Sequence, residues 1–111
     1  MLESIYQRKL IEKLRDRFPD CIIQKNDTDY IQGYPDITIL YEDRWAVLEV
    51  KASEDARHQP NQEWYVRRLN EMSFAAFIYP ENEEEVLRAL QRSFKTYRTS
   101  RVSLAKRVSL D

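Results

Sequence analysis

Two short apolar segments separated by three residues constrain this 111-residue chain more than any other feature. Residues 36–41 (DITILY) and 45–50 (WAVLEV) are rich in β-branched and apolar side chains, as buried strands are, and the polar residues 42–44 between them suit a tight turn. Strands joined by so short a connection pair as an antiparallel hairpin. The fold is therefore expected to contain a sheet with this hairpin in it.

The other segments alternate between helical and extended patterns. The expected elements are, in chain order, a helix over 2–18, a strand over 21–25, the two hairpin strands, a helix over 60–72, a strand over 73–79 and a helix over 80–91. Pro60 and Pro80 suit the first positions of the last two helices. The order α-β-β-β-α-β-α predicts an α/β fold in which a mixed central sheet is flanked by helices.

Charge is distributed unevenly along the chain. The net charge is −1, but residues 92–111 hold six of the 18 basic residues and one of the 19 acidic ones. We expect one domain over 1–94, followed by a basic C-terminal tail over 95–111. The tail could bind phosphate groups or could simply keep the protein soluble, and the sequence favours neither.

Cysteine usage and hydropathy indicate the compartment. Cys21 is the single cysteine, so no internal disulfide can form, and no Cys/His cluster accompanies it. No apolar run reaches the roughly 20 residues that span a membrane, and the polar N-terminus does not resemble a signal peptide. We expect a cytoplasmic protein that does not associate with membranes.

Ionisable residues interrupt the apolar hairpin. Glu49 and Lys51 are two residues apart on one strand, so they face the same side, and Asp36 begins the partner strand. In an antiparallel hairpin the start of one strand lies beside the end of the other, so Asp36 and Glu49 should be neighbours. Paired carboxylates favour a shared proton or a cation such as Mg²⁺ between them. The alternative is a turn aspartate beside a solvated Glu–Lys ion pair.

These residues carry a family resemblance. Pro35-Asp36, twelve intervening residues and then Glu49-Val50-Lys51 resemble the motif of the PD-(D/E)XK nuclease superfamily, whose core is a restriction-endonuclease-like αβββαβ fold. The strings QGYPDITIL, RWAVLEVKAS, PNQEWYVRRLN and FAAFIYP are similar to the VRR-NUC branch and to small phage endonucleases. That branch is related to the phage endonuclease I type of Holliday-junction resolvase. The resemblance covers roughly residues 1–91.

The resemblance implies roles for individual residues. Asp36 and Glu49 would be metal ligands, the Val50 carbonyl would complete part of the metal site, and Lys51 would be the catalytic lysine. An acidic residue of the first helix often reaches the metal in this family. Glu3 is the candidate here and Glu12 the reserve, although a glutamate such as Glu3 can also simply complement the helix dipole.

Further positions could contact the substrate. Gln62 matches the glutamine that follows the catalytic strand in this family, where it would place the substrate or hold the lysine; it could equally lie on the polar face of its helix. Candidate nucleic-acid contacts are Lys25, Gln32, Arg98, Arg101, Lys106 and Arg107. Trp45, Trp64 and Tyr65 could stack on bases, but their periodicity favours core packing. His58 is expected to be merely solvated.

The sequence therefore predicts a Mg²⁺-dependent DNA endonuclease in which Mn²⁺ substitutes, with the 5′-phosphate and 3′-hydroxyl products that the resemblance implies. No sequence-reading module is evident, so we expect selectivity for branched DNA or Holliday junctions, and a homodimer where two strands are cut. DNA is not distinguished from RNA. Two alternatives remain, namely a non-catalytic nucleic-acid-binding module of the same fold and a protein that self-associates through its acidic body and basic tail.

Overall fold

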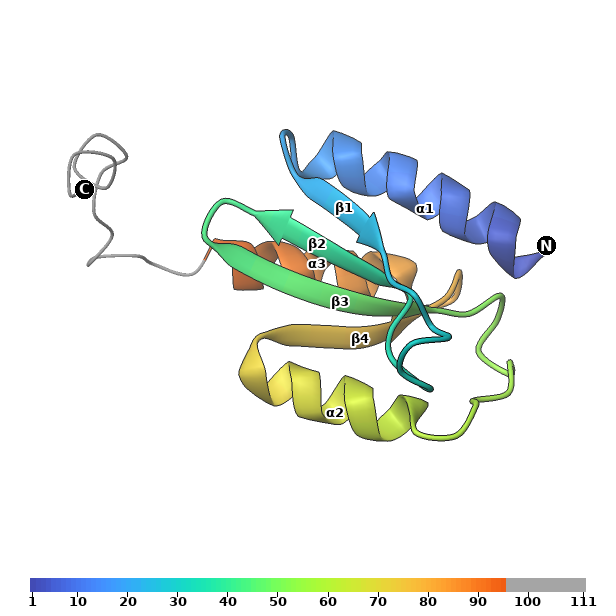
Figure 1. Cartoon of the computed structure of the whole chain (residues 1–111). Coiled ribbons are helices and arrows are strands. Elements are labelled where there is room, and N and C mark those ends of the chain that lie inside the picture. The colour runs from blue at the N-terminus through green and yellow to red at the C-terminus, as the bar shows by residue number, and fades with distance from the viewer. Residues whose placement is uncertain (96–111) are drawn as a thin grey trace.

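A four-stranded mixed sheet forms the centre of the computed structural model, which describes residues 1–95 (Figure 1). The elements are α1 (Glu3–Arg17), β1 (Ile22–Lys25), β2 (Ile37–Tyr41), β3 (Arg44–Val50), α2 (Gln62–Met72), β4 (Phe74–Ile78) and α3 (Glu83–Phe94). The strand order is β1-β2-β3-β4, with β1–β2 and β2–β3 antiparallel and β3–β4 parallel. The predicted α/β class and the predicted order of elements are confirmed.

The hairpin of β2 and β3 has a well-defined register. Ile37 lies opposite Leu48, and Tyr41 lies opposite Arg44. Arg44 therefore belongs to β3, and the connection contains two residues instead of the expected three. A two-residue connection requires positive φ at a turn position, and Glu42 supplies it with φ = 55°. The turn thus forms without a glycine.

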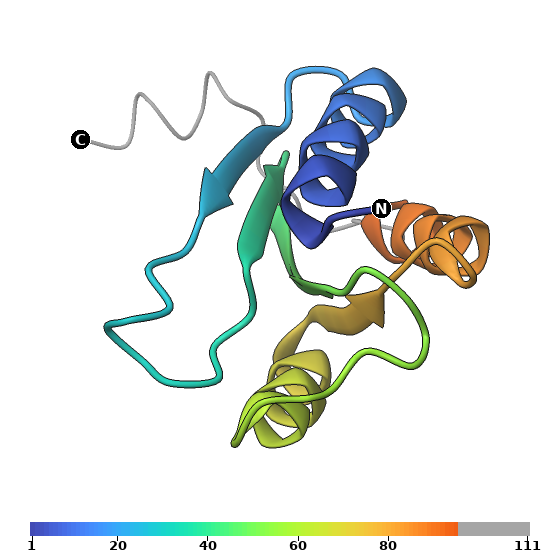
Figure 2. The ribbon, with the colours of Figure 1, turned by 90° about the vertical axis from the view of Figure 1, so that its right-hand side faces the viewer.

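The two faces of the sheet are covered by different helices (Figure 2). Leu48 and Val50 of β3 pack in a cluster with α1 and α3, whereas Val47 packs in a second cluster with α2. Side chains alternate along a strand, so Glu49 and Lys51 face the same side as Val47. The two faces predicted for this strand are confirmed.

Polar contacts join α1 to α3 on their shared face. The Tyr6 hydroxyl donates a hydrogen bond to Glu83 Oε1 at 2.9 Å, and Lys13 Nζ lies 2.7 Å from Glu83 Oε2. These contacts lie beside the apolar cluster and fix α1 against α3. No helix within residues 1–95 is long and apolar enough to cross a membrane.

Both prolines expected to begin helices lie outside them. Asn61 has a left-handed backbone, with φ = 72°, so Pro60 cannot continue into α2. Asn82 precedes α3, and its side chain accepts a hydrogen bond from the Tyr79 N–H and donates one to the Phe77 carbonyl. Pro60 and Pro80 therefore shape the turns that precede these helices, and the predicted helix starts were two to three residues too early.

Candidate active site

A cleft of about 430 Å³ opens at the end of the sheet where β2 begins and β3 ends. The N-terminal end of α1, the loop between β1 and β2 and the loop between β3 and α2 gather at this end (Figures 1 and 2). The charged side chains that line the cleft are Glu3, Asp36, Glu49, Lys51 and Arg57. The carboxylates and the lysine singled out from the sequence thus line one cleft.

Asp36 holds the ends of the two strands together. Its Oδ2 accepts a hydrogen bond from the Val50 N–H at 2.8 Å. The hairpin register, continued by two residues, brings Pro35 opposite Val50, but proline has no N–H to give to the Val50 carbonyl. Regular pairing ends here, and the Asp36 carboxylate takes over the contact with the Val50 N–H.

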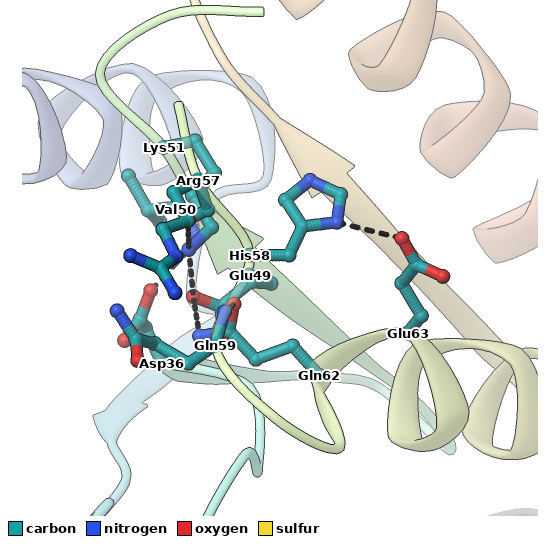
Figure 3. A network of polar contacts seen from close by, with 9 residues as sticks. All are labelled: Asp36, Glu49, Val50, Lys51, Arg57, His58, Gln59, Gln62 and Glu63. Atoms are coloured by element: carbon teal, nitrogen blue, oxygen red, sulfur yellow. Dashed lines mark hydrogen bonds and ion pairs between the residues drawn. The ribbon is translucent and has the colours of Figure 1, made fainter. Parts of the chain in front are cut away.

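Glu49 lies beside Asp36 and is almost completely buried, with 2% of its surface exposed (Figure 3). Its Oε2 accepts a hydrogen bond from Gln62 Nε2 at 3.0 Å, whereas its Oε1 is buried without a hydrogen-bond partner among the described residues. Burial raises the pKa of Glu49 to about 8, and the neighbouring Asp36 and, to a smaller extent, Glu3 act in the same direction. The buried Glu49 carboxyl would therefore be stabilised by either a bound cation or a proton.

Lys51 is the buried cation of the cleft, with 5% of its surface exposed. Its Nζ donates a hydrogen bond to the Arg57 carbonyl at 3.1 Å and lies 3.7 Å from Glu49 Oε2. The ammonium group lowers the pKa of Glu49 but does not cancel the effect of burial. The alternative of a solvated Glu–Lys pair does not apply, because both side chains are buried.

Glu3, at the start of α1, lines the same cleft, whereas Glu12 is exposed and does not line it. Burial raises the pKa of Glu3, the charge of Asp36 adds to the rise, and Lys51 opposes it. Of the two acidic candidates on α1, the structure therefore brings Glu3 to the site.

Gly33 joins the two loops that border the cleft. Its φ is +87°, and a Cβ atom added to it would lie 2.6 Å from the Pro60 carbonyl oxygen and 2.8 Å from Asn61 Cβ. The loop between β1 and β2 therefore packs directly against the segment that leads into α2. Any side chain at this position would push the two loops apart.

The remaining predicted residues are distributed differently. Gln62 donates a hydrogen bond to Glu49 and accepts one from the Gln59 N–H. Within residues 1–95 it makes no hydrogen bond to Lys51, so the expectation that it holds the lysine is not supported. Gln32 lines the cleft, whereas Lys25 is exposed at the end of β1 and does not line it. The tail residues Arg98, Arg101, Lys106 and Arg107 lie outside the described residues.

Sequence reasoning missed part of the site and misplaced one aromatic side chain. Arg57 holds Lys51 through its backbone carbonyl, an interaction with no signature in the side-chain sequence. Gln59 lines the cleft from the same polar loop. Trp64 is 56% exposed, so the expectation that it packs in the core was wrong, while Tyr65 and Trp45 do pack against the cluster beside α2.

The donor set suits a hard divalent cation. No group of three or more His, Cys, Asp or Glu side chains within residues 1–95 could hold a metal ion, so Glu3 does not complete a three-carboxylate cluster. Mg²⁺ commonly needs only one or two protein carboxylates, with water and substrate phosphate as its other ligands. The pair of Asp36 and Glu49, with the unpartnered Oε1, meets that smaller requirement.

The cleft combines an anionic pair that can hold a cation with a buried ammonium group beside it. With a cation bound to the carboxylates, such a site could hold a phosphate oxygen near both the cation and the Lys51 ammonium group. A scan of protein-family models finds none that matches this chain, and no curated protein and no solved structure matches it either.

Proposed function

We propose that this protein is a metal-dependent DNA endonuclease that resembles the PD-(D/E)XK superfamily, with Asp36, Glu49 and Lys51 at its active centre. The observation that carries the proposal is the buried Glu49 carboxyl, whose Oε1 has no partner among the described residues, beside Asp36 at the mouth of an open cleft. Two carboxyl groups and an ammonium group lie together where the strands end. This arrangement fits a role in phosphodiester hydrolysis better than a purely structural role.

Stability does not explain this cluster. A buried carboxyl that lacks one hydrogen bond costs free energy, and a second carboxyl beside it adds repulsion. Apolar residues at positions 49 and 51 would continue the pattern of β3 at lower cost. A cluster that costs stability and lines an open cleft therefore supports a functional role.

Asp36 and Glu49 would hold Mg²⁺ or Mn²⁺. The Val50 carbonyl oxygen would be a further metal ligand, because Pro35 has no N–H to donate to it, and Glu3, which lines the same cleft, would add a carboxylate near the cation. When bound, the cation supplies an activated water and polarises the scissile phosphate. Because the pKa of Glu49 is raised to about 8, this carboxyl keeps a proton at neutral pH, and metal binding there would release it.

Lys51 would act on the phosphate directly. The Arg57 carbonyl, 3.1 Å from Nζ, fixes the ammonium group on the same side of β3 as Glu49. From there it can stabilise the extra negative charge that a phosphodiester gains in the transition state. Gln62 would act as a positioning residue, because its amide holds Glu49 Oε2 and leaves Oε1 without a hydrogen bond from the described residues.

DNA that departs from a regular duplex is the proposed substrate class, including branched DNA and four-way junctions. The described domain has no separate module that reads base sequence. Residues 1–95 form one such cleft in each chain, so cutting both strands of a junction would need two copies in a homodimer.

The test is cleavage of labelled four-way junction, flap, duplex and single-stranded DNA in MgCl₂, MnCl₂ and EDTA. Wild type is compared with Lys51→Ala and Asp36→Asn, and with Lys9→Ala as a control for loss of one exposed lysine. We expect cutting that requires metal, is lost by about 100-fold or more in the two site variants and is unchanged in the control. A wild type that cuts none of these substrates contradicts the proposal.

The alternative is a non-catalytic nucleic-acid-binding module. The absence of a three-ligand cluster within residues 1–95 favours it. Titration calorimetry of the folded protein with MgCl₂ and MnCl₂ separates the two functions. DNA binding without any heat of metal binding would support the module, whereas metal binding that Asp36→Asn abolishes would support the nuclease.

A further inference from the structure

A second cleft, of about 500 Å³, lies beside the candidate active site. Arg57 and Gln59 line both clefts, so the two are continuous along the loop that precedes α2. Trp64 and Arg67 of α2 form part of its wall. This second cleft has no role in the nuclease chemistry described above.

Trp64 is presented on the surface by its neighbours. Its side chain is 56% exposed, an unusual state for a tryptophan in a small domain. The Tyr65 ring meets it edge-on at 5.0 Å between centroids, and Tyr65 meets Tyr34 at 5.6 Å. Because Tyr34 lines the first cleft, these three rings form a packed series that links the two clefts.

The charges around Trp64 suit an anion. Arg67 follows Trp64 by three residues and so lies on the same side of α2. Glu63 is the one carboxylate among the residues that line this cleft, and it is paired with His58 at 3.0 Å (Figure 3). Arg57 and Arg67 therefore line the second cleft, and its one carboxylate, Glu63, is already paired with His58.

We propose that the second cleft binds an unpaired nucleotide of the strand whose phosphate lies at Asp36 and Glu49. Its base stacks on Trp64, and Arg67 contacts its phosphate. Inside a duplex both faces of a base are covered by neighbouring bases, so only an unpaired base can stack in this way. The proposal rests on the nuclease function and deepens it, because it defines the substrate as DNA with a single-stranded segment beside the cut.

The first test measures binding without chemistry. The chain has two tryptophans, so Trp45→Phe leaves Trp64 as the sole fluorescent tryptophan. In EDTA, we expect oligo-dT to quench the fluorescence of this variant much more than a blunt duplex does. By fluorescence anisotropy of labelled oligo-dT, Trp64→Ala should lose about tenfold or more in affinity, and Trp64→Phe should retain most of it.

Arg67→Ala and Arg68→Ala form a matched pair. Both arginines are exposed on α2, but only Arg67 lines the second cleft. We expect Arg67→Ala to weaken oligo-dT binding and to reduce its salt dependence, and Arg68→Ala to do so much less. Equal effects of the two substitutions, or equal quenching by duplex and oligo-dT, would overturn the proposal.

A second measurement separates this inference from the nuclease proposal. Wild type and Trp64→Ala are compared for cleavage of flap and duplex DNA in MgCl₂. Loss of the flap preference in Trp64→Ala supports the subsite, and an unchanged preference refutes it. If wild type cuts nothing while the binding differences in EDTA persist, the nuclease proposal fails and the nucleotide-binding cleft stands.

Discussion

The carboxamide of Gln62 donates a hydrogen bond to Glu49 Oε2 at 3.0 Å, and the other oxygen of the same buried carboxyl has no partner among the described residues. One side chain on α2 thereby fixes the orientation of the Glu49 carboxyl on β3. The amide itself is held in turn, because Gln62 Oε1 accepts a hydrogen bond from the Gln59 N–H at 2.7 Å. The loop before α2 and the strand β3 are therefore coupled through one glutamine.

Removing this amide should weaken the site without removing a ligand. We expect Gln62→Ala to reduce metal affinity or cleavage by about 10- to 100-fold, the usual effect of losing a partner that orients a ligand. Metal affinity is measured by calorimetry and cleavage on the preferred DNA. Gln24→Ala, on the exposed side of β1, is the control. If Gln62→Ala and Gln24→Ala behave alike, Gln62 does not position Glu49.

Stability in the absence of metal should depend on pH through Glu49. Its pKa in the folded protein is about 8, well above its ordinary value of 4.5, so between these values the folded state keeps a proton that the unfolded state releases. Stability from this group is thus fully present below pH 4.5 and declines as the pH rises toward 8, by up to about 1.4 kcal/mol per pH unit.

Glu49→Gln should remove that decline. The amide is similar in shape and uncharged, so we expect the variant to be more stable than wild type at pH 8 and to show a flatter profile from pH 5 to 8. Urea unfolding in EDTA measures both curves. Glu12→Gln, at an exposed position of α1, controls for the loss of a surface charge. Parallel curves for wild type and Glu49→Gln would show that Glu49 is already ionised near neutral pH.

Divalent metal should stabilise the folded protein at pH 8. A cation bound only by the folded state adds about 2.7 kcal/mol at a concentration 100 times its Kd. We expect MgCl₂ to raise the Tm of wild type and to have little effect on Asp36→Asn. Asp16→Asn, exposed on α1, should respond as wild type does. An equal rise in all three proteins would point to a general salt effect.

Gly33→Ala tests the contact between the two loops. The added Cβ would need to lie 2.6 Å from the Pro60 carbonyl oxygen, in a backbone with φ = +87°. We expect a loss of more than about 1 kcal/mol in the free energy of unfolding and a larger proportional loss of cleavage, because the cleft must widen. Asp29→Ala, an exposed position in the same loop, should change neither quantity. A Gly33→Ala protein of normal stability would show that the loops separate freely.

Much of the fold followed from the sequence because its signals are local and strong. The short connection after Tyr41 permits only a hairpin, and the apolar alternation within it leaves one register that buries Ile37 opposite Leu48. That register alone makes Asp36 and Glu49 neighbours. The predicted convergence of the carboxylates and Lys51 therefore rested on geometry as well as on resemblance, and the structure brings all three to one cleft.

The errors arose where tertiary contacts, and not the local sequence, determine the conformation or the burial of a residue. Pro60 suits a helix start, but Asn61 takes a left-handed conformation where the loop of Gly33 packs against it. Trp64 was expected to be buried, but Gln62, Val66 and Leu69 form the buried side of α2 and Trp64 lies on the opposite side. The choice between Glu3 and Glu12 depended on how α1 lies across the sheet. Helical periodicity in the sequence gives no information on that placement. The role of the Arg57 carbonyl belongs to the backbone and leaves no trace in residue type.

The order of the strands also bears on how the protein folds. Asp36 immediately precedes β2 and Glu49 lies in β3, and these strands are joined by two residues, so the most local contacts of the sheet bring the two carboxyl groups together. Gln62, which holds Glu49, lies on the long crossover that must form before β4 can pair in parallel with β3. We therefore expect the hairpin to form early with Glu49 still solvated, and the burial of its carboxyl to accompany the late docking of α2 and β4.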